Sequence, residues 1–331
     1  MYSNPTFIKK IKANVEGRDF IVGDIHGCYN EFKRLLDYVK FDPLRDRVFS
    51  TGDLLDRGPS PYECLNLLKK PWFHAVLGNH EDILLTRYMA IHKNDQKELS
   101  KLSKKDIQYV LDLEEFIPYV LKMPLVYEIE HLLLDKFYIV HAEVLPEHLS
   151  RFSEEESSSK TPSEKYVGYL NDLNKRDYSE QIAGFFEENE DKIIPFKLKQ
   201  EMIWSRKLVG KFNREHKKLV EEGDFSFMEE ESFEQKYKIF CGHNVVPFPM
   251  KIGQQYYLDT GCALGYSDKE IGSNLFTLFG HEFFALTMVD VTSGYCFACI
   301  STEEKRGQIV KLDKSLYEKE LVEDNKSDDE Q

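Results

Sequence analysis

The chain has 331 residues, of which 41% are hydrophobic and 31% charged, so it can form an apolar core with a well-solvated surface. Lys and Arg number 44 against 58 Asp and Glu, and the formal charge of -14 excludes a broad electrostatic grip on a nucleic-acid backbone. No segment approaches the roughly 20 apolar residues of a membrane helix, and the N-terminus lacks an apolar stretch of secretory length. We therefore expect a cytoplasmic protein without membrane contact.

The six cysteines are too few and too scattered for a disulfide framework, so we expect reduced thiols. Cys296 and Cys299 form a CxxC pair inside an apolar segment that is typical of a strand. Because no second pair completes a zinc knot, this pair favours a structural role over a metal or redox role.

Short apolar runs alternate with amphipathic ones in the first half of the chain, which indicates an α/β sheet. Residues 19–22 (DFIV) predict a buried strand. Residues 30–39 follow with apolar side chains at helical spacing, and 47–51 predict the next strand. A second helix is expected after Pro61, over YECLNLLKK.

The same alternation continues with a strand at 74–77 and a helix that begins in EDILLTRYMA. Further apolar runs predict strands at 137–140, 237–240 and 255–258. Five of these six strands lead directly into a polar motif. Since ligands of open α/β sheets gather beyond the carboxyl ends of strands, we expect the polar groups to meet at one rim.

The pattern loosens between residues 145 and 235, where polar and acidic stretches surround modest helical segments. We interpret 145–235 as an insertion or cap within a single catalytic domain that spans 1–312. Residues 313–331 are charged and poor in apolar side chains, which predicts a flexible tail.

A set of short motifs carries the chemistry: GDIHG at 23–27, GDLLDRG at 52–58, GNHE at 78–81, VHA at 140–142 and CGH at 241–243. Asp24 and His26 lie two residues apart on a tight turn and can bind one cation. Asp53, at the next strand end, can bridge two cations through its two oxygens. The neutral donors that would complete the second ion's shell are Asn79, His141 and His243.

The alternative for each histidine is a hydrogen-bonded place in the core, but six suitable residues at successive strand ends favour metal ligands. A set of carboxylates and imidazoles without thiolate suits manganese, iron or zinc.

With GDxHG, GDxxDRG and GNHE in this order, the sequence resembles the phosphoprotein phosphatase family of metallophosphoesterases, which includes Ser/Thr protein phosphatases and bacterial diadenosine tetraphosphatases. The resemblance is close over residues 19–143 and looser over 204–262. It implies an α/β sandwich of two mixed β-sheets flanked by helices, with a helical or irregular cap. It also implies two divalent ions, with manganese first and iron, zinc or nickel as alternatives, and a bridging hydroxide that attacks phosphorus in line without a phosphoenzyme.

The resemblance also implies roles for four residues outside the ligand set. His80 corresponds to the general acid, and Asp56 to the carboxylate that orients it. Arg57 corresponds to an arginine that binds phosphate oxygens, and IWSR at 203–206 suggests Arg206 as a second one. The alternatives are a surface histidine beside a solvated carboxylate for His80 and a helix-terminal ion pair for Arg57.

Two positions depart from the usual family pattern: Glu143 follows His141 in HAE, and Asn244 follows His243 in GHN. We expect Glu143 to add a carboxylate near the metals and both changes to alter substrate geometry. The segment LDTGC at 258–262 is similar to that of bacterial and diadenosine-type members, which implies a bacterial or viral type of enzyme. Asp259 is interpreted there as supporting structure.

These patterns leave three functions open. The first is a Ser/Thr-type protein phosphatase acting on a phosphorylated protein, which GNHE favours slightly over GNHD. The second is a bis(5'-nucleosyl)-tetraphosphatase acting on dinucleoside polyphosphates or a related small phosphoester. The third is an inactive scaffold that keeps the fold, which the complete ligand set argues against.

Overall fold

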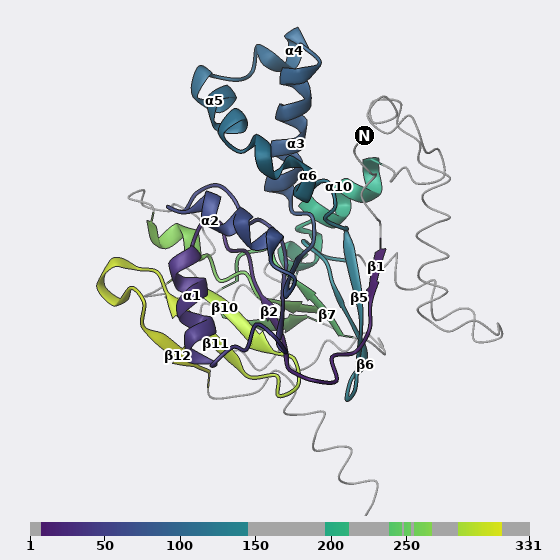
Figure 1. Ribbon diagram of the computed structural model, residues 1–331, viewed down its shortest axis with the longest axis vertical. Helices are drawn as coiled ribbons and strands as arrows, with labels where there is room; N and C mark the ends of the chain where they lie inside the picture. Colours follow the sequence, from purple (N-terminus) through teal and green to yellow (C-terminus); the bar gives the residue numbers. More distant parts are fainter. Residues whose placement is uncertain are drawn as a thin grey trace, which may run out of the picture.

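The computed structural model describes residues 8–144, 196–211, 238–246, 248–252, 255–266 and 284–312. Two mixed sheets of six strands each form the centre of the molecule (Figure 1). One sheet has the order β1 (Ile8–Ile11), β5 (Val126–His131), β6 (Asp135–Ile139), β7 (Lys238–Cys241), β9 (Gln255–Tyr257) and β8 (Met250–Ile252). The other has the order β12 (Ile309–Lys311), β11 (Cys296–Ile300), β10 (Ala285–Asp290), β2 (Asp19–Val22), β3 (Arg47–Ser50) and β4 (Phe73–Ala75).

The two sheets enclose an apolar core to which both contribute. Phe49 of β3 packs edge-on against Tyr127 of β5 and Phe137 of β6, at ring-centroid distances of 5.8 Å and 6.2 Å. Phe240 stacks on Tyr256 within the same core. Strands such as β2 are buried on both faces. This explains why DFIV contains a continuous apolar run, whereas apolar and polar residues would alternate in a half-exposed strand.

Helices cover the outer faces of the sheets. α1 (Tyr29–Tyr38) lies over β10, β11 and β12 (Figure 1). Its own Phe32 and Leu35 are fully buried. The remaining helical elements are α2 (Pro61–Asn66), η1 (Leu67–Lys69), α3 (Asn79–His92), α4 (Gln96–Leu99), α5 (Lys104–Asp112), η2 (Glu114–Phe116), α6 (Ile117–Val120), α10 (Phe196–Trp204), η6 (Cys262–Tyr266) and η7 (Glu303–Lys305). α4 and α5 lie far from the sheets, at the end of α3 (Figure 1).

The sandwich of two mixed sheets that the sequence implied is confirmed, and each expected strand and helix has a counterpart within a few residues. The six expected strands divide equally, with β2, β3 and β4 in one sheet and β6, β7 and β9 in the other. Among the described residues, no helix has the length and apolar character to cross a membrane.

Most of the expected cap at 145–235 and the whole tail at 313–331 lie outside the described residues. Of the cap, α10 and the following residues to 211 are described. The single catalytic domain over 1–312 stays a prediction.

The CxxC pair of β11 is divided by its sheet. Cys296 belongs to the core between the sheets, whereas Cys299 packs in the core on the helix-covered side. Residues three apart on a strand point to opposite faces, so these two thiols do not form one site.

Candidate metal centre

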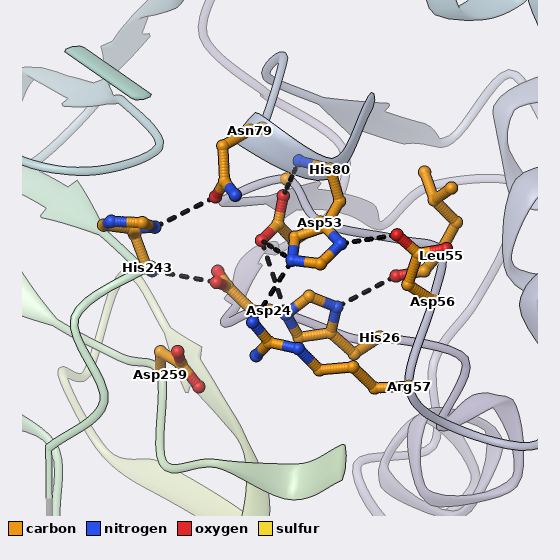
Figure 2. A network of polar contacts seen from close by, with 12 residues as sticks. Asp24, His26, Asp53, Leu55, Asp56, Arg57, Asn79, His80, His243 and Asp259 are labelled. Carbon is orange, nitrogen blue, oxygen red and sulfur yellow. Dashed lines mark hydrogen bonds and ion pairs between the residues drawn. The ribbon is translucent and has the colours of Figure 1, made fainter. Parts of the chain in front are cut away.

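Six predicted ligands meet where the two sheets come together. Asp24 and His26 follow β2, Asp53 follows β3, and Asn79 begins α3 after β4. His141 and His243 follow β6 and β7 of the other sheet. Five of these six side chains are labelled in Figure 2, where they point toward a common space. Each of the six is buried.

Strained backbone gathers in the same loops. Positive φ angles occur at His26 (43°), Asp53 (50°), Asp56 (67°), Arg57 (65°) and His243 (60°). A non-glycine residue in such a conformation costs on the order of 1–3 kcal/mol and persists where surrounding contacts enforce it. The loops are therefore built to aim these side chains, at the expense of local stability.

Asp53 lies between two groups of candidate ligands. Its Oδ2 is 3.3 Å from His26 Nε2, and its Oδ1 is 3.6 Å from His141 Nε2. One group consists of His26, Asp53 and His80, the other of Asp53, His141 and His243, and within each group the ligand atoms lie within 4.8 Å of one another. One carboxylate shared by two groups is the arrangement that a bridge between two cations requires.

The neutral candidate ligands bring their polar atoms close to one another. His141 Nδ1 donates to the carbonyl of Thr51 at 2.7 Å, so its Nε2 is unprotonated in the neutral ring and faces Asn79 Oδ1 at 2.9 Å. Burial lowers the pKa of His141 to about 3, which keeps the ring neutral. His243 Nδ1 is 3.0 Å from the same Asn79 oxygen, and its buried Nε2 has no hydrogen-bond partner. Converging acceptors of this kind fit a cation between them.

Asp24 is held by two donors at the edge of this cluster. Its Oδ1 accepts from the Thr51 hydroxyl at 2.8 Å, and its Oδ2 accepts from the backbone N–H of His243 at 2.8 Å. Burial, followed by the charges of Asp259 and Asp53, raises the pKa of Asp24 well above its usual range. A divalent cation would relieve this crowding of carboxylates.

Asp259 is a member of the cluster that sequence reasoning treated as supporting structure. It follows β9, is 3% exposed, and its carboxylate interacts with that of Asp24. Figure 2 shows Asp259 on the same side of the site as Asp24. Its place after a predicted strand, like that of the candidate ligands, was the signal that could have identified it as part of this cluster. The whole donor set, with carboxylates, an amide and imidazoles but no thiolate, fits manganese, iron or zinc.

His80, Asp56 and Arg57 form a chain of polar contacts beside Asp53. His80 Nδ1 donates to Asp56 Oδ2 at 2.5 Å, while its backbone N–H donates to Asp53 Oδ1 at 2.9 Å. Burial alone would raise the pKa of Asp56, but the hydrogen bond and charge of His80 outweigh it and lower the pKa. Arg57 is exposed and places Nη2 3.2 Å from His80 Nε2 (Figure 2).

Arg206, the predicted second phosphate ligand, is exposed just after α10. Its charge contributes to lowering the pKa values of both His141 and His243, although burial is the largest cause for each. Arg206 therefore lies near the second group of ligands, while its role in binding phosphate stays a prediction.

Glu143, which we expected to add a carboxylate near the metals, has both its oxygens hydrogen-bonded to groups outside the candidate ligand set. Its Oε1 accepts from the Ser205 hydroxyl at 2.7 Å and from the backbone of Leu208 at 2.9 Å, and its Oε2 accepts from Tyr257 at 3.3 Å. Asn244 donates to the carbonyl of Ser205 at 3.0 Å. Both departures from the family pattern thus anchor the segment that contains Arg206.

Glu81 is a second residue whose part in the site the sequence did not reveal. Its Oε1 accepts from the backbone of Leu54 at 2.7 Å, and its Oε2 accepts from Asp53 and Gly78 at 2.9 Å and 3.0 Å. These bonds hold the positive-φ turn that carries Asp53. The last letter of GNHE is therefore a positioning group for the loop.

Comparison with known proteins agrees with this geometry. The sequence matches the family described as "Calcineurin-like phosphoesterase" over residues 20–282, which is more than half of the chain. It is 37% identical over 131 residues to a symmetrical bis(5'-nucleosyl)-tetraphosphatase of Erwinia tasmaniensis, covering 39% of this chain and 45% of that protein. It is 44% identical over 77 residues to serine/threonine-protein phosphatase 1 of Salmonella typhimurium, covering 23% and 36%.

Among solved structures, a cold-active protein tyrosine phosphatase aligns with a TM-score of 0.47 at 14% identity, over 93% of this chain and 81% of the other. The chain spans less than half the length of each of these two curated relatives. The family match extends from β2 past both groups of candidate ligands. The chain belongs to the calcineurin-like phosphoesterase family.

Proposed function

We propose that this chain is a metal-dependent phosphoester hydrolase. The observation that supports it most directly is Asp53, whose two carboxylate oxygens face two separate groups of buried ligands. Asp24, His26 and Asp53 would hold one cation. Asp53 would share a second cation with Asn79, His141 and His243. Because all these donors are oxygen or nitrogen atoms, manganese or a similar ion fits both positions.

When bound, two such cations supply Lewis acidity toward phosphoryl oxygens and lower the pKa of coordinated water. The chain itself supplies the proton for the leaving group. Asp56 fixes the Nδ1–H tautomer of His80 and stabilises the charged ring, which leaves Nε2 to carry a proton toward the leaving oxygen.

Arg57 would couple the binding of phosphate to the protonation of His80 Nε2. Its guanidinium donates to His80 Nε2 at 3.2 Å in the described state. A phosphate oxyanion that attracts the guanidinium would free Nε2 to be protonated. We assign Arg206 to a further phosphate oxygen, since its charge already acts on the ligands of the second group.

The first substrate class that we propose is a phosphorylated serine or threonine of a protein, as expected from the sequence. The GNHE motif no longer supports this choice, because Glu81 faces the backbone of the Asp53 loop. The second class is a dinucleoside polyphosphate. It is favoured by Trp204, which is 41% exposed and lies 6.0 Å from the His243 ring, where an indole can stack on a nucleobase.

Metal analysis and a simple aryl phosphate test the hydrolytic proposal. Purified protein loaded with Mn²⁺ should hold two ions and hydrolyse 4-nitrophenyl phosphate. Asp53→Asn should lower occupancy of both ions because the shared ligand loses its charge. Two bound ions without hydrolysis would instead support the inactive scaffold.

A substrate panel separates the two substrate classes. Phosphopeptides and diadenosine tetraphosphate are compared by kcat/KM with wild type and Trp204→Ala. Loss confined to the dinucleotide would support base stacking, whereas an equal loss on both would reject it. The cytoplasmic location stays a prediction.

A further inference from the structure

A second group of buried side chains of metal-ligand type lies where the start of α1 meets η6. Cys28 precedes α1, Glu31 lies in its first turn, and Cys262 begins η6. A carboxylate oxygen and the two thiol sulfurs all lie within 4.8 Å of one another. The three residues are 0%, 2% and 2% exposed, so solvent does not satisfy their polar atoms.

Glu31 has one oxygen that the surrounding protein leaves unsatisfied. Its Oε1 accepts from the Tyr266 hydroxyl at 2.6 Å, whereas its Oε2 is buried without a hydrogen-bond partner. A buried acceptor in this state costs about 1–3 kcal/mol, and more when the group is charged. Such a group requires a cation, a proton or an ordered water beside it.

The neighbouring side chains select among these possibilities. The Cys28 and Cys262 thiols become thiolates when they bind metal, and thiolates prefer zinc and other soft cations. Sulfur ligands at about 2.3 Å from a tetrahedral zinc ion lie roughly 3.8 Å apart, which the observed spacing accommodates. Two further buried thiols, Cys64 and Cys299, are close enough for the charge of Glu31 to add to the effect of burial on their pKa values.

We propose that Cys28, Glu31 and Cys262 form a site for one thiophilic divalent cation, with Zn²⁺ as the fitting ion. Binding deprotonates the two thiols and releases two protons to solvent, and Glu31 contributes a carboxylate oxygen. The ion joins the start of α1 to η6. Because His26 lies two residues before Cys28 and Asp259 three before Cys262, the site braces two loops of the candidate metal centre.

Cobalt titration of the full-length protein tests this site. Under reducing conditions, Co²⁺ bound by thiolates gives a sulfur-to-cobalt charge-transfer band in the near ultraviolet, whereas Co²⁺ on oxygen and nitrogen ligands does not. Wild type should show the band, and Zn²⁺ should remove it by displacing cobalt. Asp53→Asn should retain it, which separates this site from the hydrolytic proposal.

Three variants locate the ligands. Cys28→Ser and Cys262→Ser should each lose the band, and Glu31→Gln should need more Co²⁺ to reach half-saturation. Cys296→Ser is the matched control, because its thiol is equally buried but lies between the sheets, and it should behave as wild type. Absence of the band in folded wild type, or its persistence in both serine variants, would overturn the proposal. Titration of wild type alone decides the matter if a serine variant does not fold.

Discussion

At the scale of single residues, the candidate site contains pairs in which a hydrogen-bond acceptor fixes the tautomer of a histidine ring. The Thr51 carbonyl fixes the tautomer of His141, and Asp56 does the same for His80. A carboxylate on one ring nitrogen makes the other nitrogen a better base or ligand. Substitutions at these pairs should therefore change chemistry more than folding.

Replacing His80 by Asn tests the general acid. We expect kcat to fall by about 10²- to 10⁴-fold on an alkyl phosphate, because the poor leaving group needs a proton. The loss on 4-nitrophenyl phosphate should be much smaller, since that leaving group is stable as an anion. Rates measured on both substrates at fixed Mn²⁺ check this. Equal losses would mean that His80 positions the site without donating a proton.

Glu81→Gln tests the support beneath Asp53. The amide nitrogen of Gln cannot accept the backbone N–H bonds that one carboxylate oxygen now receives from Asp53 and Gly78. We expect a loss of about 1–3 kcal/mol in the free energy of unfolding, measured in urea, together with weaker Mn²⁺ binding. The exposed control Glu16→Gln should change stability by less than about 0.5 kcal/mol. Unchanged stability in Glu81→Gln would contradict this role.

At the scale of elements, the segment at the end of α10 is hydrogen-bonded to two loops of the candidate metal centre. Glu143 and Asn244 each follow a predicted histidine ligand, and both bind Ser205. The segment that carries Trp204 and Arg206 is thereby attached to the loops after β6 and β7. Glu143 and Asn244, which differ from the usual family residues, should therefore affect substrate binding through the segment that carries Trp204 and Arg206.

Glu143→Ala should loosen this attachment. It removes a carboxylate that accepts from Ser205, Leu208 and Tyr257, each a charge-assisted hydrogen bond worth about 1.5–3 kcal/mol. We expect KM for phosphorylated substrates to rise by roughly tenfold while kcat changes little, because Arg206 is held less firmly. Glu128→Ala, which removes an equally buried carboxylate of β5, is the control and should lower stability without changing KM. A loss of kcat alone in Glu143→Ala would refute this.

At the scale of the whole molecule, the two sheets bury polar groups whose titration affects stability. His74 of β4 packs against Phe49 and Tyr127, at ring-centroid distances of 5.0 Å and 5.9 Å. Burial, with smaller effects from Lys9 and Arg47, lowers the pKa of His74 to about 4. The ring thus stays neutral in the folded protein at a pH where it is protonated in the unfolded chain.

This shift predicts a specific loss of stability in acid. The unfolded chain takes up a proton at His74 below about pH 6.5, whereas the folded protein does so only near pH 4. The stability contribution is therefore complete at neutral pH and falls as the pH drops between these values. Between about pH 7 and pH 5, wild type should lose on the order of 2 kcal/mol more than His74→Phe in urea unfolding. Parallel losses in the two proteins would rule out this contribution.

Much of the fold could be predicted from local sequence. Strands that are buried on both faces form continuous apolar runs in the sequence, and the candidate ligand motifs follow these runs directly. Asp24, Asp53 and Asn79 could be identified in this way, since each belongs to a short motif next to a strand. Their convergence with His141 and His243 followed from strand ends and the family resemblance.

Contacts between distant segments were decided by the packing of the two sheets. The backbone of His243 reaches Asp24 across 219 residues, and Glu143 turns toward Ser205 instead of the metal ligands. The proximity of Cys28 to Cys262 likewise has no local signal, because it depends on how the chain brings η6 next to the start of α1. Local sequence determines which groups a turn presents, whereas the direction in which a buried carboxylate points depends on donors that only the folded chain brings near.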